Sequence, residues 1–438
     1  MNSVLIRGGR VLDPSEGRDE TADILVEDGI IRAIGGDIAG SGGEMIDARG
    51  LVVCPGFIDL HVHLREPGRE DKETIATGTR AAAAGGFTSI CPMPNTEPVI
   101  DSASGVNHVL ALAARDGVVR VLPTAAVTVG QRGEDIAEFG DLANAGAVAF
   151  SDDGRPVADP GIMRRALEYT SMLGRPVFNH AELPALVGDG VIHEGVVSAR
   201  IGLKGIPAAA ETACVARDVE IAAETGGHLH IQHVSTGRAC QIIAEAKSRG
   251  VNVTAEACPH HLVLTEEAVA NFSTLARVSP PLRSAADREA IRAALRDGVI
   301  DCVATDHAPH TDIEKDQPFD QAPPGMIGLD FAFALLFTEL VDTDLLPLEV
   351  LIQRMTSDPA HVLGIGAGTL CIGAPADITI LDLEGETRVI PEAIHSRSKN
   401  TPFLGRTLRG AVAHTLVGGR LVFSRGEIVV DRETARAR

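Results

Sequence analysis

The chain has 438 residues, of which 45% are hydrophobic and 23% are charged. This length and balance are typical of a globular protein with one large domain and a smaller companion, and they exclude a disordered chain. The formal net charge of −21 repels polyanions, so we expect neither a nucleic-acid partner nor binding to anionic membranes. The sequence opens without a signal-peptide pattern and has no apolar run long enough to span a membrane, which predicts a cytoplasmic protein.

Short β patterns occupy both ends of the chain. Residues 1–53 alternate apolar and polar side chains between Gly and Asp turn signals, and residues 366–438 have the same character. Chain ends commonly lie close together in space. We therefore expect 1–53 and 366–438 to form one small β-sandwich domain around a catalytic domain at 54–365.

The middle of the chain alternates short apolar runs with longer Ala-rich stretches of helical periodicity. The clearest helical stretches are 74–84, 159–173, 211–225 and 237–249. Eight β/α units of this kind favour a TIM-type (β/α)₈ barrel over an open, doubly wound sheet. The eight predicted strands are 52–61, 87–92, 119–124, 147–151, 176–180, 228–233, 251–256 and 299–306.

Metal-ligand side chains stand at the carboxyl ends of these strands, where a barrel enzyme has its active site. His61 and His63 are two residues apart, so both can lie on one face of the first strand. One such residue alone could be an ordinary polar side chain or a helix cap, but six at five strand ends predict a metal centre. The six are His61, His63, Asp153, His180, His233 and Asp306.

This set of ligands also indicates how many metal ions to expect. Imidazole and carboxylate ligands suit Zn²⁺, with Mn²⁺, Co²⁺ and Fe²⁺ as alternatives. One catalytic zinc uses three protein ligands, so six predict two ions that share a hydroxide, with Asp153 as the candidate bridge. His228 and His230 are out of phase with His233 and are interpreted as structural. His260 and His261 follow the seventh strand but are not needed to complete the centre.

Polar side chains beside the predicted centre indicate a small anionic substrate. Arg65 follows the first strand, Asn95 the second and His310 the eighth, so the three can converge on one mouth. A guanidinium can hold a carboxylate through two parallel hydrogen bonds. Residues 311–328 are rich in Pro, Gly and charge, which is typical of a lid loop.

Eight motifs along the chain resemble those of the class I dihydroorotases of the amidohydrolase superfamily, in content and in order. They are DLHVHLREPG, MPNTEP, FSDDG, NHAE, QHVST, CPHHL, VSPPLR and TDHAPH. The resemblance spans nearly the whole chain. It implies the reversible cyclisation of N-carbamoyl-L-aspartate to L-dihydroorotate, a step of de novo pyrimidine biosynthesis.

The resemblance also implies the roles of individual residues. His61, His63 and Asp306 would hold one Zn²⁺ and His180 and His233 the other, with Asp153 bridging in place of the carboxylated lysine of many relatives. A zinc-bound hydroxide would attack the ring amide, with Asp306 as general base and then acid. The implied substrate contacts come from His63, Arg65, Asn95, Ser279, His310, Pro324 and Gly325.

Two positions depart from the pattern of this family. Ser279 stands where an asparagine is usual, and Pro324 precedes Gly325 where a phenylalanine is usual. The serine is shorter, and a proline has no N–H to donate. Both changes bear on substrate contacts more than on the metal centre.

Two alternatives remain open from the sequence. A hydantoinase or dihydropyrimidinase would use the same barrel and metals, but such relatives depend on a carboxylated lysine and lack the Arg65 and Asn95 pocket. A non-catalytic dihydroorotase-like subunit would support aspartate carbamoyltransferase, but such chains typically lose metal ligands. We expect a homo-oligomer, and aspartate carbamoyltransferase is a candidate partner.

Overall fold

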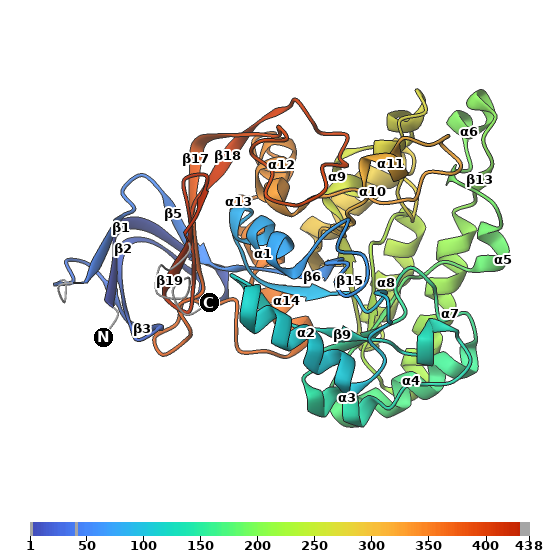
Figure 1. The fold of residues 1–438 in the computed structure, drawn as a ribbon, viewed down its shortest axis with the longest axis horizontal. Coiled ribbons are helices and arrows are strands. Elements are labelled where there is room, and N and C mark those ends of the chain that lie inside the picture. The colour runs from blue at the N-terminus through green and yellow to red at the C-terminus, as the bar shows by residue number, and fades with distance from the viewer. Residues whose placement is uncertain (1–2, 40–42, 430–438) are drawn as a thin grey trace.

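The computed structural model describes residues 3–39 and 43–429, and Figure 1 shows a β-rich part beside a larger part of helices and strands. The β-rich part is a nine-stranded sheet in the order β20-β19-β18-β17-β5-β1-β2-β3, with β4 beside β1. Its strands come from both ends of the chain: β1 (Ser3–Asp13), β2 (Arg18–Glu27), β3 (Ile30–Gly35), β4 (Glu44–Asp47), β5 (Val52–Pro55), β17 (Ile378–Arg388), β18 (Thr407–Val417), β19 (Arg420–Ser424) and β20 (Glu427–Ile428).

One hydrophobic core holds the two ends together. Ile6 and Ile24 from the first part of the chain pack with Ile378 and Ile380 from the last part, and all four are buried. Burial of apolar surface is the dominant favourable term in folding. The β-sandwich expected from both ends of the chain is therefore confirmed, while residues 430–438 of the predicted C-terminal part lie outside the described residues.

The larger part is a barrel of short parallel strands. Two parallel sheets run in the orders β6-β7-β8 and β9-β10-β11-β14-β15-β16, and a parallel bridge between Val62 and His307 joins the first strand to the segment after the last. The strands are β6 (Phe57–Val62), β7 (Phe87–Pro92), β8 (Arg120–Val121), β9 (Thr124–Ala125), β10 (Ala149–Ser151), β11 (Val177–Asn179), β14 (Leu229–Ile231), β15 (Val253–Ala257) and β16 (Cys302–Val303). This confirms the predicted TIM-type barrel.

Helices cover the outside of the barrel (Figure 1). The longer ones are α1 (Ile75–Ala84), α2 (Ala103–Asp116), α4 (Pro160–Leu173), α7 (Ala209–Thr225), α8 (Gly237–Ser248) and α10 (Ala285–Arg296). The shorter ones are α3 (Phe139–Ala145), α5 (Pro184–Val187), α6 (Val196–Ile201), α9 (Pro259–Val263), α11 (Asp312–Lys315), α12 (Ala332–Leu336), α13 (Leu348–Met355) and α14 (Ser357–Leu363). A two-stranded pair, β12 (Ile192–His193) and β13 (Gly205–Ile206), lies beyond β11 in the chain. The four helices predicted from periodicity are confirmed to within two residues.

Helix α4 shows why the sequence defines these helices well. The Asp159 side chain accepts hydrogen bonds from the backbone N–H groups of Gly161 and Ile162, and Pro160 occupies the first turn. Gly174 ends the helix in the left-handed conformation that favours glycine. Ile162 and Leu167 are among the residues that face the core.

Two predicted strands are wrong as single elements, because residues 52–61 and residues 119–124 each divide between two sheets, the latter into β8 and β9. Residues 52–61 divide at Gly56 into β5, which belongs to the sandwich sheet, and β6, which begins the barrel. A side chain on Gly56 would collide with Thr88, because an added Cβ would lie 2.2 Å from its Oγ1. The chain crosses between the two parts at this close approach, which a continuous apolar run does not reveal.

No described helix is long and apolar enough to cross a membrane. All seven cysteines are free; six are buried, whereas Cys371 is partly exposed.

Candidate metal centre

Six side chains meet at the carboxyl ends of the barrel strands. His61 lies within β6 and His63 follows it, while the other four residues follow β10, β11, β14 and β16 within three positions. All six are buried, with exposed fractions of 7% or less. The structure thus brings together His61, His63, Asp153, His180, His233 and Asp306.

Asp153 lies at the centre of the group. Its Oδ1 is 3.3 Å from His61 Nε2 and 3.7 Å from both His180 Nδ1 and His233 Nε2. Its Oδ2 is 3.4 Å from His63 Nε2. One carboxylate therefore contacts all four imidazoles, which is the position that a bridging anion requires.

Asp306 completes the second half of the group. Its Oδ1 is 3.0 Å from His63 Nε2 and 3.5 Å from His61 Nε2. The donor atoms form two overlapping triplets, His61–His63–Asp306 and His61–Asp153–His233, and within each triplet the atoms lie within 4.8 Å of one another. His61 belongs to both triplets and thus joins two neighbouring groups of potential ligands.

Unpaired nitrogen atoms indicate that the group is built to hold a cation. Among the described residues, His61 Nε2 and both ring nitrogens of His233 are buried without a hydrogen-bond partner. Burying a polar atom unpaired costs about 1–3 kcal/mol. Imidazole and carboxylate ligands also match the preferences of zinc and related divalent ions. The residues therefore fit a metal.

Neighbouring histidines keep the two carboxyl groups of the site ionised. Burial by itself would raise the pKa of the Asp153 carboxyl, but His61, His180 and His233 hold that pKa well below its usual range. Burial likewise opposes ionisation of Asp306, and its pKa is held low by His61 and His63. Both carboxylates are therefore ionised at neutral pH, as metal ligands must be.

The backbone is strained at three positions beside the centre. The φ angles are +59° at Arg65, +33° at His233 and +46° at Asp306. Non-glycine residues rarely adopt positive φ, and such strain is concentrated at functional sites. The surrounding structure therefore holds these three side chains in orientations that a relaxed backbone would not give.

Two glutamates that the sequence reasoning missed hold the histidines in place. Glu256 Oε1 accepts from His61 Nδ1 at 2.7 Å, and its Oε2 is 3.1 Å from His230 Nε2. Glu182 Oε2 is 3.1 Å from His180 Nε2. A carboxylate behind a ligating histidine fixes the ring and its tautomer. A clue was present in the sequence, because Glu256 lies inside an apolar strand, where a charge must be paired.

The predicted anion pocket contains one permanent cation and a neutral histidine. An Nη atom of Arg65 lies 3.5 Å from His310 Nε2, and Arg65 Nε donates to the Pro309 carbonyl. Burial lowers the pKa of Arg65 to about 10, which leaves it charged. Burial, Arg65 and Lys72 lower the pKa of His310 to about 2, so its imidazole is neutral. Lys72 Nζ lies 3.3 Å from His310 Nδ1, and its charge is paired with Glu314 at 2.8 Å.

The remaining predicted substrate contacts are engaged with protein atoms. Asn95 Oδ1 accepts from His63 Nδ1, and its Nδ2 is 3.4 Å from Asp153 Oδ2. Ser279 Oγ donates to Glu182 at 3.0 Å. Asn95 therefore contacts two residues of the candidate centre, and Ser279 reaches it through Glu182, which contacts His180.

The pair at 324–325 supports His310. The Pro324 carbonyl accepts from His310 Nε2 at 2.9 Å, and the Gly325 N–H donates to the Arg277 carbonyl. Gly325 has a φ of +130°, and an added Cβ would lie 3.1 Å from His310 Nε2. A glycine is therefore required at position 325. The proline at position 324 retains its carbonyl, which is the backbone group that the His310 side chain contacts.

Comparison with known proteins places this site in a family. Residues 50–239 match the family model described as Dihydro-orotase-like, and residues 197–423 match the Amidohydrolase family. The dihydroorotase of Pelotomaculum thermopropionicum is 53% identical, over 96% of this chain and 98% of the relative. That of Geobacter metallireducens is 50% identical, over 97% of this chain and all of the relative.

The chain belongs to the dihydroorotase family. Solved structures of a hydantoinase and a dihydropyrimidinase share the fold of this family member. The L-hydantoinase (dihydropyrimidinase) of Arthrobacter aurescens is 27% identical with a TM-score of 0.89, over 98% of both chains. The dihydropyrimidinase of Brevibacillus agri is 26% identical with a TM-score of 0.85, over 98% of this chain and 96% of that one. The family and the predicted fold class are thereby confirmed.

Proposed function

We propose that this chain is a dihydroorotase, a metal-dependent hydrolase that interconverts L-dihydroorotate and N-carbamoyl-L-aspartate. The observation that carries the proposal is about 50% identity to several dihydroorotases over nearly the full length of both chains. The geometry agrees, because a buried guanidinium lies beside six potential metal ligands. Both proposed substrates carry a carboxylate that such a cation can hold.

We further propose that two zinc ions occupy the centre. His61, His63 and Asp306 would hold one ion and His180 and His233 the other, with Asp153 between them. Zinc bound there would supply Lewis acidity and lower the pKa of a bound water. The proposal is supported by the contacts of Asp153 with all four imidazoles and by the unpaired nitrogens of His61 and His233.

In the ring-opening direction the chain's own residues move one proton and position one carboxylate. Asp306 accepts a proton from the attacking water as the new carbon–oxygen bond forms. It then gives that proton to the ring nitrogen as the carbon–nitrogen bond breaks, which makes it general base and general acid in turn. Arg65, with Asn95 and His310 beside it, would hold the substrate carboxylate, so the ring carbonyl is presented in one orientation.

The competing function is that of a hydantoinase, because solved hydantoinases share the fold at TM-scores of 0.84 to 0.89. The purified enzyme should be assayed with L-dihydroorotate, hydantoin and dihydrouracil, with metal counted on the same sample. We expect turnover of L-dihydroorotate and little of the two uncharged rings, because only the first has a carboxylate for Arg65. Equal turnover of hydantoin would favour the competing function, and no turnover by metal-loaded protein would favour a non-catalytic subunit.

Exchange of Arg65 for lysine tests the carboxylate pocket. We expect Arg65→Lys to raise KM for L-dihydroorotate by about 10- to 100-fold, since bonds to charged groups contribute about 1.5–3 kcal/mol and an ammonium cannot form the two-pronged contact. Steady-state kinetics and metal analysis would measure this. Arg164→Lys, at an exposed position of α4 where the arginine pairs with Glu168, is the control. An unchanged KM, or metal loss that accounts for the change, would contradict the assignment.

Several expectations stay predictions. These are the cytoplasmic location, a homo-oligomeric state, the partnership with aspartate carbamoyltransferase, and a lid at residues 311–328. In the structure residues 311–328 contain α11, and the buried Lys315 donates to the carbonyls of Pro323 and Gly325.

A further inference from the structure

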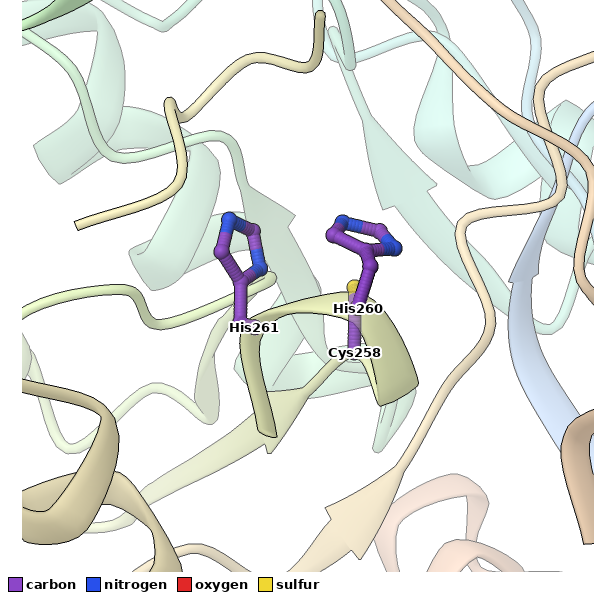
Figure 2. A group of neighbouring side chains, drawn as sticks. All are labelled: Cys258, His260 and His261. Atoms are coloured by element: carbon purple, nitrogen blue, oxygen red, sulfur yellow. The ribbon is translucent and has the colours of Figure 1, made fainter. Parts of the chain in front are cut away.

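A second cluster of metal-ligand side chains lies outside the six residues of the centre. Cys258, His260 and His261 occur at the start of α9, directly after β15. One donor atom from each lies within 4.8 Å of the other two, and all three residues are buried. Figure 2 shows the two imidazole rings and the sulfur gathered at this short helix. The proposed reaction uses none of the three.

The hydrogen bonds of His261 leave one nitrogen available as a ligand. Its Nε2 is 3.0 Å from the Pro280 carbonyl, which can only accept, so Nε2 carries the proton. Nδ1 therefore has the lone pair, and it is buried without a partner. A ligating histidine typically donates its other N–H to a backbone carbonyl in this way.

His260 presents a second unpaired nitrogen. Its Nε2 is buried and lacks a hydrogen-bond partner in the described part of the chain. Two unpaired nitrogens on adjacent, 2–3% exposed residues are unfavourable if nothing binds them. A water or a cation could satisfy them, but only a cation would also use the neighbouring sulfur, which is a weak hydrogen-bond partner.

We propose that Cys258, His260 and His261 form a third metal site, selective for a soft monovalent cation such as Cu(I). Thiolate is the ligand type that selects Cu(I) over hard ions. A thiolate and Cu(I) cancel in charge, so the ion and its sulfur ligand together add no net charge to the buried site. Binding forms one sulfur–copper bond and two nitrogen–copper bonds, and it releases the thiol proton to the buffer.

The separation of the donor atoms is compatible with this site. Metal–sulfur and metal–nitrogen bonds of about 2.3 and 2.0 Å place the donors of a three-coordinate ion about 3.5–3.8 Å apart. The donors lie within 4.8 Å of one another, which is close to that spacing. The proposal does not depend on the reaction, because it concerns residues outside the catalytic centre.

Anaerobic titration of the zinc-loaded enzyme with Cu(I), in competition with a chromophoric Cu(I) chelator, tests the site. We expect one Cu(I) per subunit with the zinc retained, and a copper X-ray absorption spectrum with one sulfur and two nitrogen neighbours. Cys258→Ser and His261→Asn should each weaken copper binding by at least about 100-fold, since each removes a bond to the ion. Neither expectation requires an activity measurement.

A second buried cysteine provides the matched control. Cys240 in α8 is buried and free, and it belongs to none of the groups of potential metal ligands in the described residues, so Cys240→Ser should bind Cu(I) like the parent. Circular dichroism and thermal melting would show that each variant is folded. The proposal is overturned if the parent binds no Cu(I) beyond the level of Cys258→Ser, if Cys240→Ser loses binding equally, or if copper enters only as zinc leaves.

Discussion

Asp153→Asn should abolish both metal binding and turnover. The asparagine has nearly the same shape but no charge, and a neutral amide cannot balance two cations between four imidazoles. The four imidazoles would then lose the anion that they share. They belong to His61, His63, His180 and His233, and each lies 3.3 to 3.7 Å from the Asp153 carboxylate. We expect hydrolysis of L-dihydroorotate to fall by at least about 1,000-fold, which corresponds to ~4 kcal/mol of transition-state stabilisation.

The measurement combines steady-state rates with metal counted by mass spectrometry on the same protein. Asp152→Asn is the matched control, because this neighbouring carboxylate accepts from the backbone N–H groups of Val127 and Thr128 and touches no histidine of the centre. It should retain its metal even if the protein is less stable. Parent-like metal content and activity in Asp153→Asn would remove the bridging role.

Asp306→Asn should have the second-largest effect, and we expect it in kcat per bound metal. Its carboxylate contacts His63 and His61, so some metal will be lost, but its proposed task is to carry a proton between water and the ring nitrogen. An amide cannot accept that proton. We expect kcat per bound metal to fall by about 100- to 10,000-fold, the usual contribution of a positioned acid–base group.

Normalising kcat to the metal content separates the two contributions of Asp306. A fall that vanishes after normalisation would show that the residue only binds metal. Asp301→Asn is a suitable control, because Asp301 lies just before β16 and pairs with Lys247 at 2.7 Å. The control should keep the kcat of the parent. A loss of kcat confined to Asp306→Asn would then show that Asp306 acts in the chemical step.

Local patterns in the sequence determined most of the fold. The capped helices and the eight apolar runs each carry their own signal, because helix caps and periodicity act over a few residues. The positions of the six metal-centre residues could also be predicted, since parallel strands in a barrel bring their carboxyl ends to one face. Their roles as ligands stay predictions that Asp153→Asn and Asp306→Asn will test.

The supporting contacts were decided only by the tertiary structure. Glu256 lies 195 residues from His61 in the chain, and Asn95 lies 58 residues from Asp153, so no local pattern links either pair. The division of residues 52–61 at Gly56 depends on Thr88, and the free nitrogen of His261 is identified only by the carbonyl of Pro280. Periodicity tells which face of an element is buried, but which atom pairs with which is fixed by packing between distant segments.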